Sequence, residues 1–376
     1  MPKRLSVAGL ALVAVLVGLG TPAWAQAGFY ITPSLSLAEE FDDNVFVTPT
    51  GKKSDFITRF IPGIELGYRS EPFTLLARSS FDAEIYARNT ELSDAATRKR
   101  AALEAKYLPY RLLTLGLNVS YIDTNTPSGL TAAAGVQLGR TKATELIVAP
   151  SAVYQFTPLD SGRLAYSFIH DTIEGGPTAN THRIEPSFAH QFTTLDTGAF
   201  HYRASVFQSE DARTVSSHAP MVAWIRQLTP LTFLTLRAGP RFIDDGSVQP
   251  EAFGSLEHRF RLAKVRLEYV RTDAVLLGHP GPVELETIAG SAEFEPLRLL
   301  AVKIEPTYSR TFGGVLARTP TFRVYGIAAS AAYPITNWLT ARLTYRFSYQ
   351  QESGPDLTHN LVTISLDAAY PIRIGQ

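Results

Sequence analysis

Apolar and polar side chains alternate strictly along several long segments of this chain. Between Leu339 and Tyr349, apolar and aromatic residues occupy the odd positions, and threonine, arginine and serine occupy the even ones. The same alternation marks residues 56–69, 113–121 and 300–309. Successive side chains of a β-strand point to opposite faces, so each segment has one apolar and one polar face. The alternation therefore predicts an all-β chain.

Turn-forming residues divide the chain into hairpins. Short turn signals lie near residues 71–73, 108–110, 157–159, 193–195, 229–231, 261–262, 295–297 and 334–336. Longer polar segments separate them, at residues 43–54, 89–97, 123–141, 173–180, 210–214, 244–248, 274–283, 311–317 and 351–356. Short turns on one side and long loops on the other are typical of outer-membrane barrels, whose short turns face the periplasm. We therefore predict a single transmembrane antiparallel up-and-down β-barrel of about 18 strands, with 16 as the alternative and both termini periplasmic.

Aromatic residues favour a membrane barrel over a soluble sandwich or propeller, in which strands would also alternate. They gather at both ends of the predicted strands, as expected where a barrel crosses two bilayer interfaces. Those near short turns are Phe73, Tyr107, Tyr110, Phe156, Phe192, Phe260, Tyr333, Trp338 and Tyr370, and those near long loops are Phe41, Phe46, Phe56 and Tyr121.

The first residues predict export. Lys3 and Arg4 precede an apolar stretch over residues 5–19, and Ala23-Trp24-Ala25 follows it, which is the order of a signal peptide cleaved after Ala25. We expect residues 1–25 to be this signal and residues 26–376 to form the barrel domain. Basic and acidic residues balance at 35 each, which indicates no nucleic-acid partner. The expected partners are outer-membrane lipid, lipopolysaccharide and the barrel-assembly machinery.

The polar faces of the strands are expected to line the lumen. An 18-stranded barrel is wide enough for water and small hydrated solutes. Two roles remain open for the charged residues on these faces: static pairing across the wall, and selection of solutes, favouring anions or anionic sugars. The candidates are Arg59, Glu65, Arg69, Arg163, Arg203, Arg237, Arg241, Lys264, Arg266, Glu268, Lys303, Glu305, Arg342, Arg346 and Asp367.

Prolines lie inside the predicted strands, although proline donates no ladder hydrogen bond. We predict that they form an outward-facing band near the upper interface, where bulges or nearby water relieve the missing donors. The prolines concerned are Pro33, Pro62, Pro150, Pro186, Pro220, Pro240 and Pro306.

No pattern for catalysis or for a cofactor emerges. His170-Asp171 is the most suggestive pair, but neighbours on a strand point to opposite faces, so we expect no hydrogen bond between them. No metal-ligand spacing, nucleophile elbow or phosphate loop occurs. An outer-membrane hydrolase is kept only as a third alternative.

The longest loop, residues 123–141, is rich in small and moderately apolar residues. Two readings stay open for it. The loop folds inward and narrows the pore, by analogy with the third loop of many porins, or it is a mobile surface loop.

Carboxylates gather at residues 39–43, where the apolar face of the first predicted strand ends. Glu40 and Asp42 share the lumen-facing parity, whereas Glu39 and Asp43 have the other. A cluster divided between two faces does not converge on one metal without a bend, so we interpret Glu40, Asp42 and Asp43 as an extracellular rim. Calcium bridging to lipopolysaccharide is a minor hypothesis for this rim.

The mature start, ITPSLSLAEEFDDNVF, and the later segments RIEPSF and KIEPTY resemble the bacterial outer-membrane family called beta-barrel porin 2. The resemblance spans essentially the whole chain after the signal, through short motifs. It implies either an unassigned porin or a component of an exopolysaccharide secretion system with periplasmic export partners. We predict a passive outer-membrane channel for small, anionic or sugar solutes, with the exopolysaccharide component as the alternative.

Overall fold

The computed structural model describes residues 28–130, 135–210, 212–279, 281–312, 321–352 and 354–374. The predicted signal peptide lies outside these ranges. Two 3-10 turns, η3 (Thr90–Leu92) and η4 (Pro127–Gly129), lie in loops. Within the described ranges, no helix is long and apolar enough to cross a membrane. The strands are β1 (Gly28–Asp42), β2 (Asp55–Arg69), β3 (Phe73–Tyr86), β4 (Asp94–Tyr110), β5 (Leu113–Thr124), β6 (Ala143–Gln155), β7 (Asp160–Ile173), β8 (Ala179–Gln191), β9 (Asp196–Ser209), β10 (Ala212–Thr229), β11 (Thr232–Ile243), β12 (Val248–Arg259), β13 (Ala263–Val275), β14 (Pro282–Leu297), β15 (Leu300–Phe312), β16 (Arg323–Pro334), β17 (Leu339–Gln351), β18 (Leu357–Ala369) and β19 (Ile372–Ile374).

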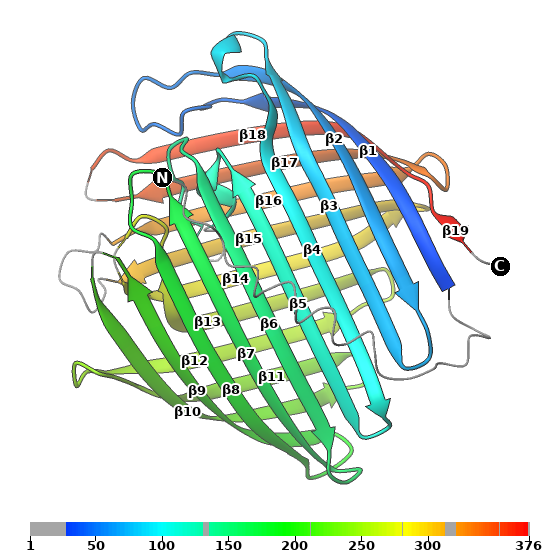
Figure 1. Ribbon diagram of the computed structural model, residues 1–376, viewed down its shortest axis with the longest axis vertical. Coiled ribbons are helices and arrows are strands. Elements are labelled where there is room, and N and C mark those ends of the chain that lie inside the picture. The colour runs from blue at the N-terminus through cyan, green and yellow to red at the C-terminus, as the bar shows by residue number, and fades with distance from the viewer. Residues whose placement is uncertain are drawn as a thin grey trace, which may run out of the picture.

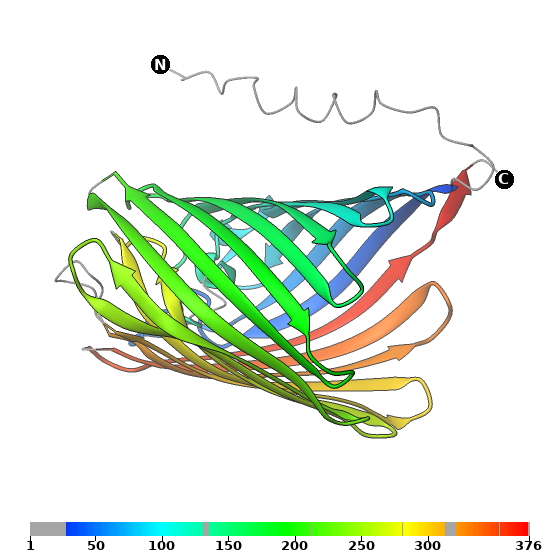
Figure 2. The ribbon, with the colours of Figure 1, turned by 90° about the horizontal axis from the view of Figure 1, so that it is seen from below.

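From β1 to β18, each strand pairs antiparallel with the next in sequence, and β1 also pairs with β18 and with the short β19 (Figure 1). β1 pairs along its whole length with β2 and, from Ser34 to Asp42, with β18. The short β19 continues the line of β18 beyond Pro371 and pairs with the start of β1. β1 and β18 thus lie side by side and close the wall (Figure 2). The predicted all-β, 18-stranded antiparallel barrel is confirmed.

The connections alternate between short and long, as predicted. The short turns are residues 70–72, 111–112, 156–159, 192–195, 230–231, 260–262, 298–299 and 335–338. We call this side of the barrel the short-turn end and the other the long-loop end. One connection at the long-loop end is shorter than the predicted residues 210–214, because β9 ends at Ser209 and β10 begins at Ala212.

The outer face of the wall is apolar. Leu35, Ile64, Leu267 and Ile364 are between 44% and 62% exposed, and they share the outward parity of their strands. A soluble protein rarely exposes a contiguous apolar surface of this extent, so the belt faces lipid. Aromatic rings lie at the short-turn end as predicted, including Phe192 at 68% exposure. The position expected for Phe46 was wrong, because this ring packs beside a buried cluster of Val45, Ile57 and Tyr86.

The strand prolines all have the outward parity, and Pro220, Pro240 and Pro250 lie level with one another across β10, β11 and β12. Their missing donors are accommodated by local gaps in the ladder. Pairing stops beside Pro186 between β8 and β9 and beside Pro220 between β10 and β11, then resumes in the same register. Relief by bulges, one of the two expected routes, is therefore wrong at these positions, because a bulge would shift the register.

Two neighbouring short turns share the sequence F-T-x-L-D-x-G, starting at Phe156 and Phe192. In each turn the threonine hydroxyl accepts hydrogen bonds from the backbone N–H groups of the leucine and the aspartate, at 3.0–3.1 Å. The phenylalanine ring covers the glycine, since a Cβ on Gly198 would lie 2.5 Å from the Phe192 ring. Glycine thus lets the ring lie flat against the wall at the membrane interface.

Candidate functional site

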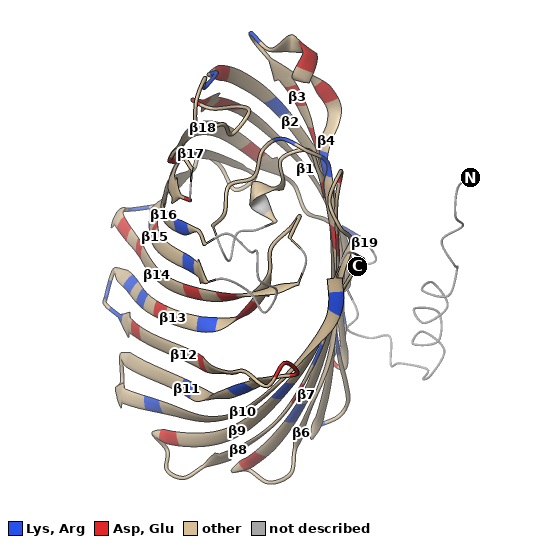
Figure 3. Cartoon of the chain, turned by 90° about the vertical axis from the view of Figure 1, so that its left-hand side faces the viewer, with Lys and Arg blue, Asp and Glu red and all other residues tan. Residues whose placement is uncertain are grey.

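The described part of the loop at residues 125–142 that follows residue 134 lies inside the lumen, against the inner wall. The loop connects β5 to β6, yet Val136 is 1% exposed in an apolar cluster with Val283 and Leu285 of β14 and Val324 of β16. The β14 and β16 strands belong to the far side of the wall. Figure 3 shows loop segments lying within the ring of strands. Of the two readings of this loop, the inward-folded one agrees with the structure.

Hydrogen bonds fasten the described parts of this loop to the wall. The backbone N–H of Gln137 donates to Oε1 of Gln350 in β17 at 2.7 Å, and its side chain lies 3.4 Å from Nδ1 of His359 in β18. On the return path, Arg140 donates to the hydroxyl of Tyr86 in β3 at 2.6 Å. The loop is therefore attached at three strands other than those it connects.

A second inward element is the upper part of the β13–β14 hairpin. β13 pairs with β12 only as far as Arg271, whereas its pairing with β14 continues to Val275. Above Arg271, β13 separates from β12 while β14 stays paired with β15 as far as Glu284. The described tip residues 276–279 lie close to the β7–β8 loop, because a Cβ added to Gly176 would be 3.3 Å from the Cα of Gly278. The hairpin therefore bridges the lumen, and its apolar face meets the loop at Val136.

Polar contacts hold the other face of the hairpin to the wall. Asp273 accepts from Arg183 of β8 at 3.0 Å and from Ser217 of β10 at 2.9 Å. Glu284 forms an ion pair with Arg241 of β11 at 3.8 Å. Burial in the tip lowers the pKa of His279, so this imidazole is neutral at pH 7. Two segments distant in sequence, loop 125–142 and the hairpin tip, thus narrow the long-loop end of the lumen; we call them the constriction.

The register places all the predicted lumen residues on the inner face, and most of them are paired. Arg59 bonds to Glu40 and Glu84 at 2.8 and 3.2 Å, and Arg203 and Arg241 share the buried Glu251. The other pairs are Glu65 with Arg78, Arg237 with Glu185, Lys264 with Glu257, Arg266 with Glu268, Lys303 with Glu305, and Arg342 with Asp367.

Five inward-facing cations are exposed and have no ion-pair partner among the described residues. Three are predicted lumen residues, Arg69, Arg163 and Arg346, and the other two are Lys106 of β4 and Arg373 of β19. Arg69, Lys106 and Arg163 lie near the short-turn end, and Arg346 lies near mid-strand in β17. In the short-turn half of the described wall, the inward-facing carboxylates have a basic partner except Glu295 at the end of β14, which has the parity of Glu293. The net unpaired charge of that half is therefore positive.

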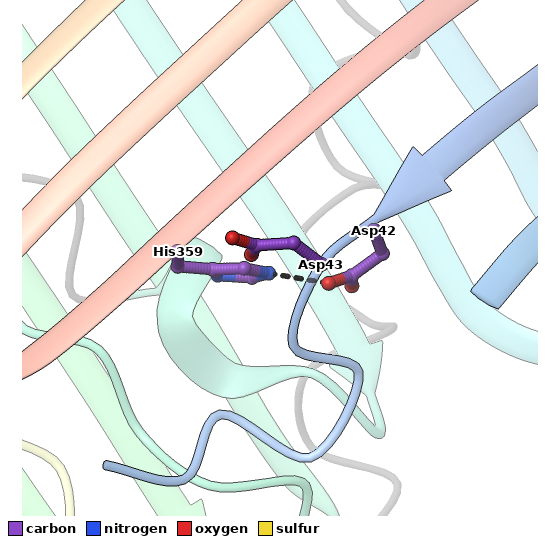
Figure 4. Close-up of side chains that lie close together, drawn as sticks. All are labelled: Asp42, Asp43 and His359. Carbon is purple, nitrogen blue, oxygen red and sulfur yellow. Dashed lines mark hydrogen bonds and ion pairs between the residues drawn. The ribbon is translucent and has the colours of Figure 1, made fainter. Parts of the chain in front are cut away.

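The acidic cluster differs from the exposed rim that the sequence predicted. Glu40 and Asp42 are only 5% and 7% exposed. β1 ends at Asp42, and the chain bends there, so the carboxylates of Asp42 and Asp43 both lie beside His359 of β18 (Figure 4). Ligand atoms of these three residues come within 4.8 Å of one another. The expectation that the two aspartates diverge was wrong, because it assumed a continuous strand.

The carboxylates of this cluster are already occupied by donors. Asp42 lies 2.8 Å from Nε2 of His359 and accepts from the backbone N–H of Asn44 at 2.7 Å. Asp43 accepts from the backbone and the side-chain amide of Asn360, both at 2.7 Å. The arrangement ties the first strand to the last at the point where the barrel closes, and these contacts need no cation.

His170 and Asp171 point to opposite faces, as expected. His170 lies 2.8 Å from the side-chain oxygen of Asn180 on the outer face, whereas Asp171 is buried on the inner face. The separation gives this pair no shared proton path for hydrolysis.

Sequence reasoning missed the hairpin as part of the site. Arg271 and Asp273 have the same parity as the lipid-facing Leu267, and charges on that parity at the end of a strand were the available signal that the segment leaves the wall. Arg183, the partner of Asp273, and Glu251, which pairs with Arg203 and Arg241, were also missed, because nothing local in the sequence relates residues of separate strands.

No family model and no curated protein sequence matches the chain. Among solved structures, it is similar to OccAB4 of Acinetobacter baumannii, with a TM-score of 0.50 and 9% identity over 93% of this chain and 100% of that one. It is also similar to OpdO of Pseudomonas aeruginosa (TM-score 0.49, 12% identity, 92% and 98% covered) and to the outer membrane protein OpdK of Pseudomonas aeruginosa (0.49, 12%, 90% and 99%). At such identities the likeness to OccAB4 supports the barrel fold alone. The resemblance to beta-barrel porin 2 stays a prediction.

Proposed function

We propose that this protein is an outer-membrane channel for passive passage of small solutes, with a preference for anionic ones. The observation that carries the proposal is a lipid-facing closed barrel whose lumen is narrowed from within by loop 125–142 and the β13–β14 hairpin. Inward segments attached to the wall narrow a wide pore to the scale of small solutes. We place the short turns and both termini in the periplasm, and the constriction on the outer side.

The preference for anions rests on the unpaired cations. Paired charges across the wall largely cancel, whereas an exposed and unpaired guanidinium or ammonium attracts anions into a low-dielectric passage. Arg69, Lys106, Arg163 and Arg346 come from four separate strands, β2, β4, β7 and β17. Positive charge is thus distributed around the lumen beyond the constriction.

Reversal potentials in planar bilayers under a potassium chloride gradient test this function. The wild-type protein should conduct with chloride permeating faster than potassium, and Arg163→Glu/Arg346→Glu should shift the reversal potential toward cation preference. Arg111→Glu is the matched control, because Arg111 lies in a short turn off the lumen wall. Absence of single-channel currents from correctly folded protein would overturn the channel proposal, and a cation-selective wild type would overturn the preference.

The alternative, a component of exopolysaccharide secretion, would need periplasmic export proteins to contact the short turns. The constriction favours small solutes over a polymer chain in this conformation. The further partners we propose are lipid and lipopolysaccharide around the apolar belt, and the barrel-assembly machinery, for which Tyr370 near the chain end is the exposed aromatic.

A further inference from the structure

A cleft of about 240 Å³ opens between the inward hairpin and the inner wall of β9 to β12. It exists because β13 separates from β12 above Arg271, so that the hairpin faces the wall across a gap that Asp273 and Glu284 only partly bridge. Its lip is the β11–β12 turn at residues 244–247, at the long-loop end. A solute entering from that end therefore meets this cleft beside the constriction.

One side of the cleft is apolar. Phe207 of β9, Val215 of β10 and Ile243 of β11 line it from the wall, and Ile243, the least buried of the three, offers the most surface to a ligand. Water against such a surface is displaced favourably by the C–H face of a ligand.

The residues at the lip supply hydrogen-bonding groups that can accept or donate further bonds to a ligand. Within the described chain, the side-chain amide of Gln249 makes no hydrogen bond. Asp245 is exposed and accepts through Oδ1 from the backbone N–H of Ser247 at 2.8 Å, and its carboxylate has further lone pairs for a ligand that reaches the lip. Hydrogen bonds from Ser247 lower the pKa of Asp245, so this group is an ionised acceptor at neutral pH.

We propose that this cleft is a binding subsite for a neutral polyol or sugar of monosaccharide size, a class within the solutes of the proposed channel function on which the inference rests. Its volume corresponds to about eight water molecules at roughly 30 Å³ each. Hydroxyl groups both donate and accept, so they match the exposed carboxylate of Asp245 and the amide of Gln249, while the ring C–H face lies against Ile243.

The charge arrangement disfavours the other small solutes. A carboxylate ligand would need a free cation, but the Arg241 side chain lining the cleft is 2% exposed and is committed to Glu251 and Glu284. An anion would also approach Asp245 at the lip. We therefore assign the attraction of anions to the unpaired cations of the short-turn half, and the recognition of hydroxyl groups to this cleft.

Saturation-transfer difference NMR on the detergent-solubilised full-length barrel tests the assignment, with D-glucose, D-galactose and myo-inositol as probes and acetate and L-alanine as charged comparisons. The wild type should show saturable transfer to at least one of the three polyols. Gln249→Ala should weaken that binding about three- to tenfold, the range for one hydrogen bond. Val215→Trp, which fills the cleft, should abolish it, and Gln191→Ala, at the short-turn end of β8, is the matched control.

Absence of polyol binding, or equal binding by Gln249→Ala and the control, would overturn the subsite. Binding of acetate or L-alanine in place of the polyols would overturn the ligand class. The channel function is judged separately by the bilayer currents, so a conducting barrel without polyol binding refutes this inference alone, and a polyol-binding barrel without currents refutes only the channel.

Discussion

Replacing Val136 with aspartate should release loop 125–142 from the lumen. The Val136 side chain is 1% exposed among Val283, Leu285 and Val324, and no basic side chain belongs to that cluster. An aspartate there would lose the burial of the valine and place an ionised carboxylate in apolar surroundings.

The energies favour detachment. Loss of the buried valine costs about 1.5–3 kcal/mol, and an unpaired buried carboxylate adds several kcal/mol. The ties of the loop to the wall include the bonds from Gln137 to Gln350 and from Arg140 to Tyr86, with longer contacts to His359 and Glu84. At about 1 kcal/mol each, these ties are weaker than the penalty, so the loop should leave while the hydrogen-bonded wall stays intact.

Single-channel conductance in planar bilayers measures the outcome, and heat-modifiable gel mobility verifies that the barrel is folded. Val136→Asp should raise the conductance above that of the wild type. Ala149→Asp introduces the same charge on the lumen face of β6, opposite the uncharged Asn118, and should leave the conductance near the wild-type value. A folded Val136→Asp barrel with wild-type conductance would refute the reasoning that this loop limits the pore.

Three further changes test the packing. Asp273→Asn should weaken the hairpin's attachment to Arg183 by about 1–3 kcal/mol, detected as earlier protease cleavage near the hairpin tip; cleavage at the wild-type rate would contradict it. Gly198→Val should lower the thermal unfolding midpoint measured by circular dichroism, because a Cβ at this position would lie 2.5 Å from the Phe192 ring. Gly254→Val, whose Cβ would have its nearest contact at 3.6 Å, should lower the midpoint less. Asp55→Ala removes a carboxylate that is 0% exposed and accepts hydrogen bonds from several backbone N–H groups. We therefore expect faster amide hydrogen exchange at residues 87–89. Unchanged exchange protection there would show that Asp55 does not hold this segment in place.

The charged residues of the lumen show what the alternation of side chains along a strand can predict and what it cannot. Arg163 and Arg346 were predicted on the inner face because a strand assigns alternate residues to alternate faces, and their register agrees. Whether such a residue is paired depends on neighbouring strands, so parity alone did not separate the paired Arg203 from the free Arg163.

The acidic cluster marks another limit of the pattern. Parity predicted that Asp42 and Asp43 diverge, and this holds only while the strand continues. Because β1 stops at Asp42, both carboxylates reach β18, more than 300 residues away in sequence. Only the closure of the barrel places His359 there.

The sequence by itself determined the barrel, its 18 strands, the lipid-facing parity and the places of the short turns, because these depend on a period of two and on local turn chemistry. It left the long loop at residues 123–141 with two readings and treated residues 274–283 as an ordinary outer connection. Only the tertiary structure decided that both segments enter the lumen and meet at Val136. The physical reason is that an inward fold is stabilised by contacts with the far wall, and those contacts exist only once the sheet has closed.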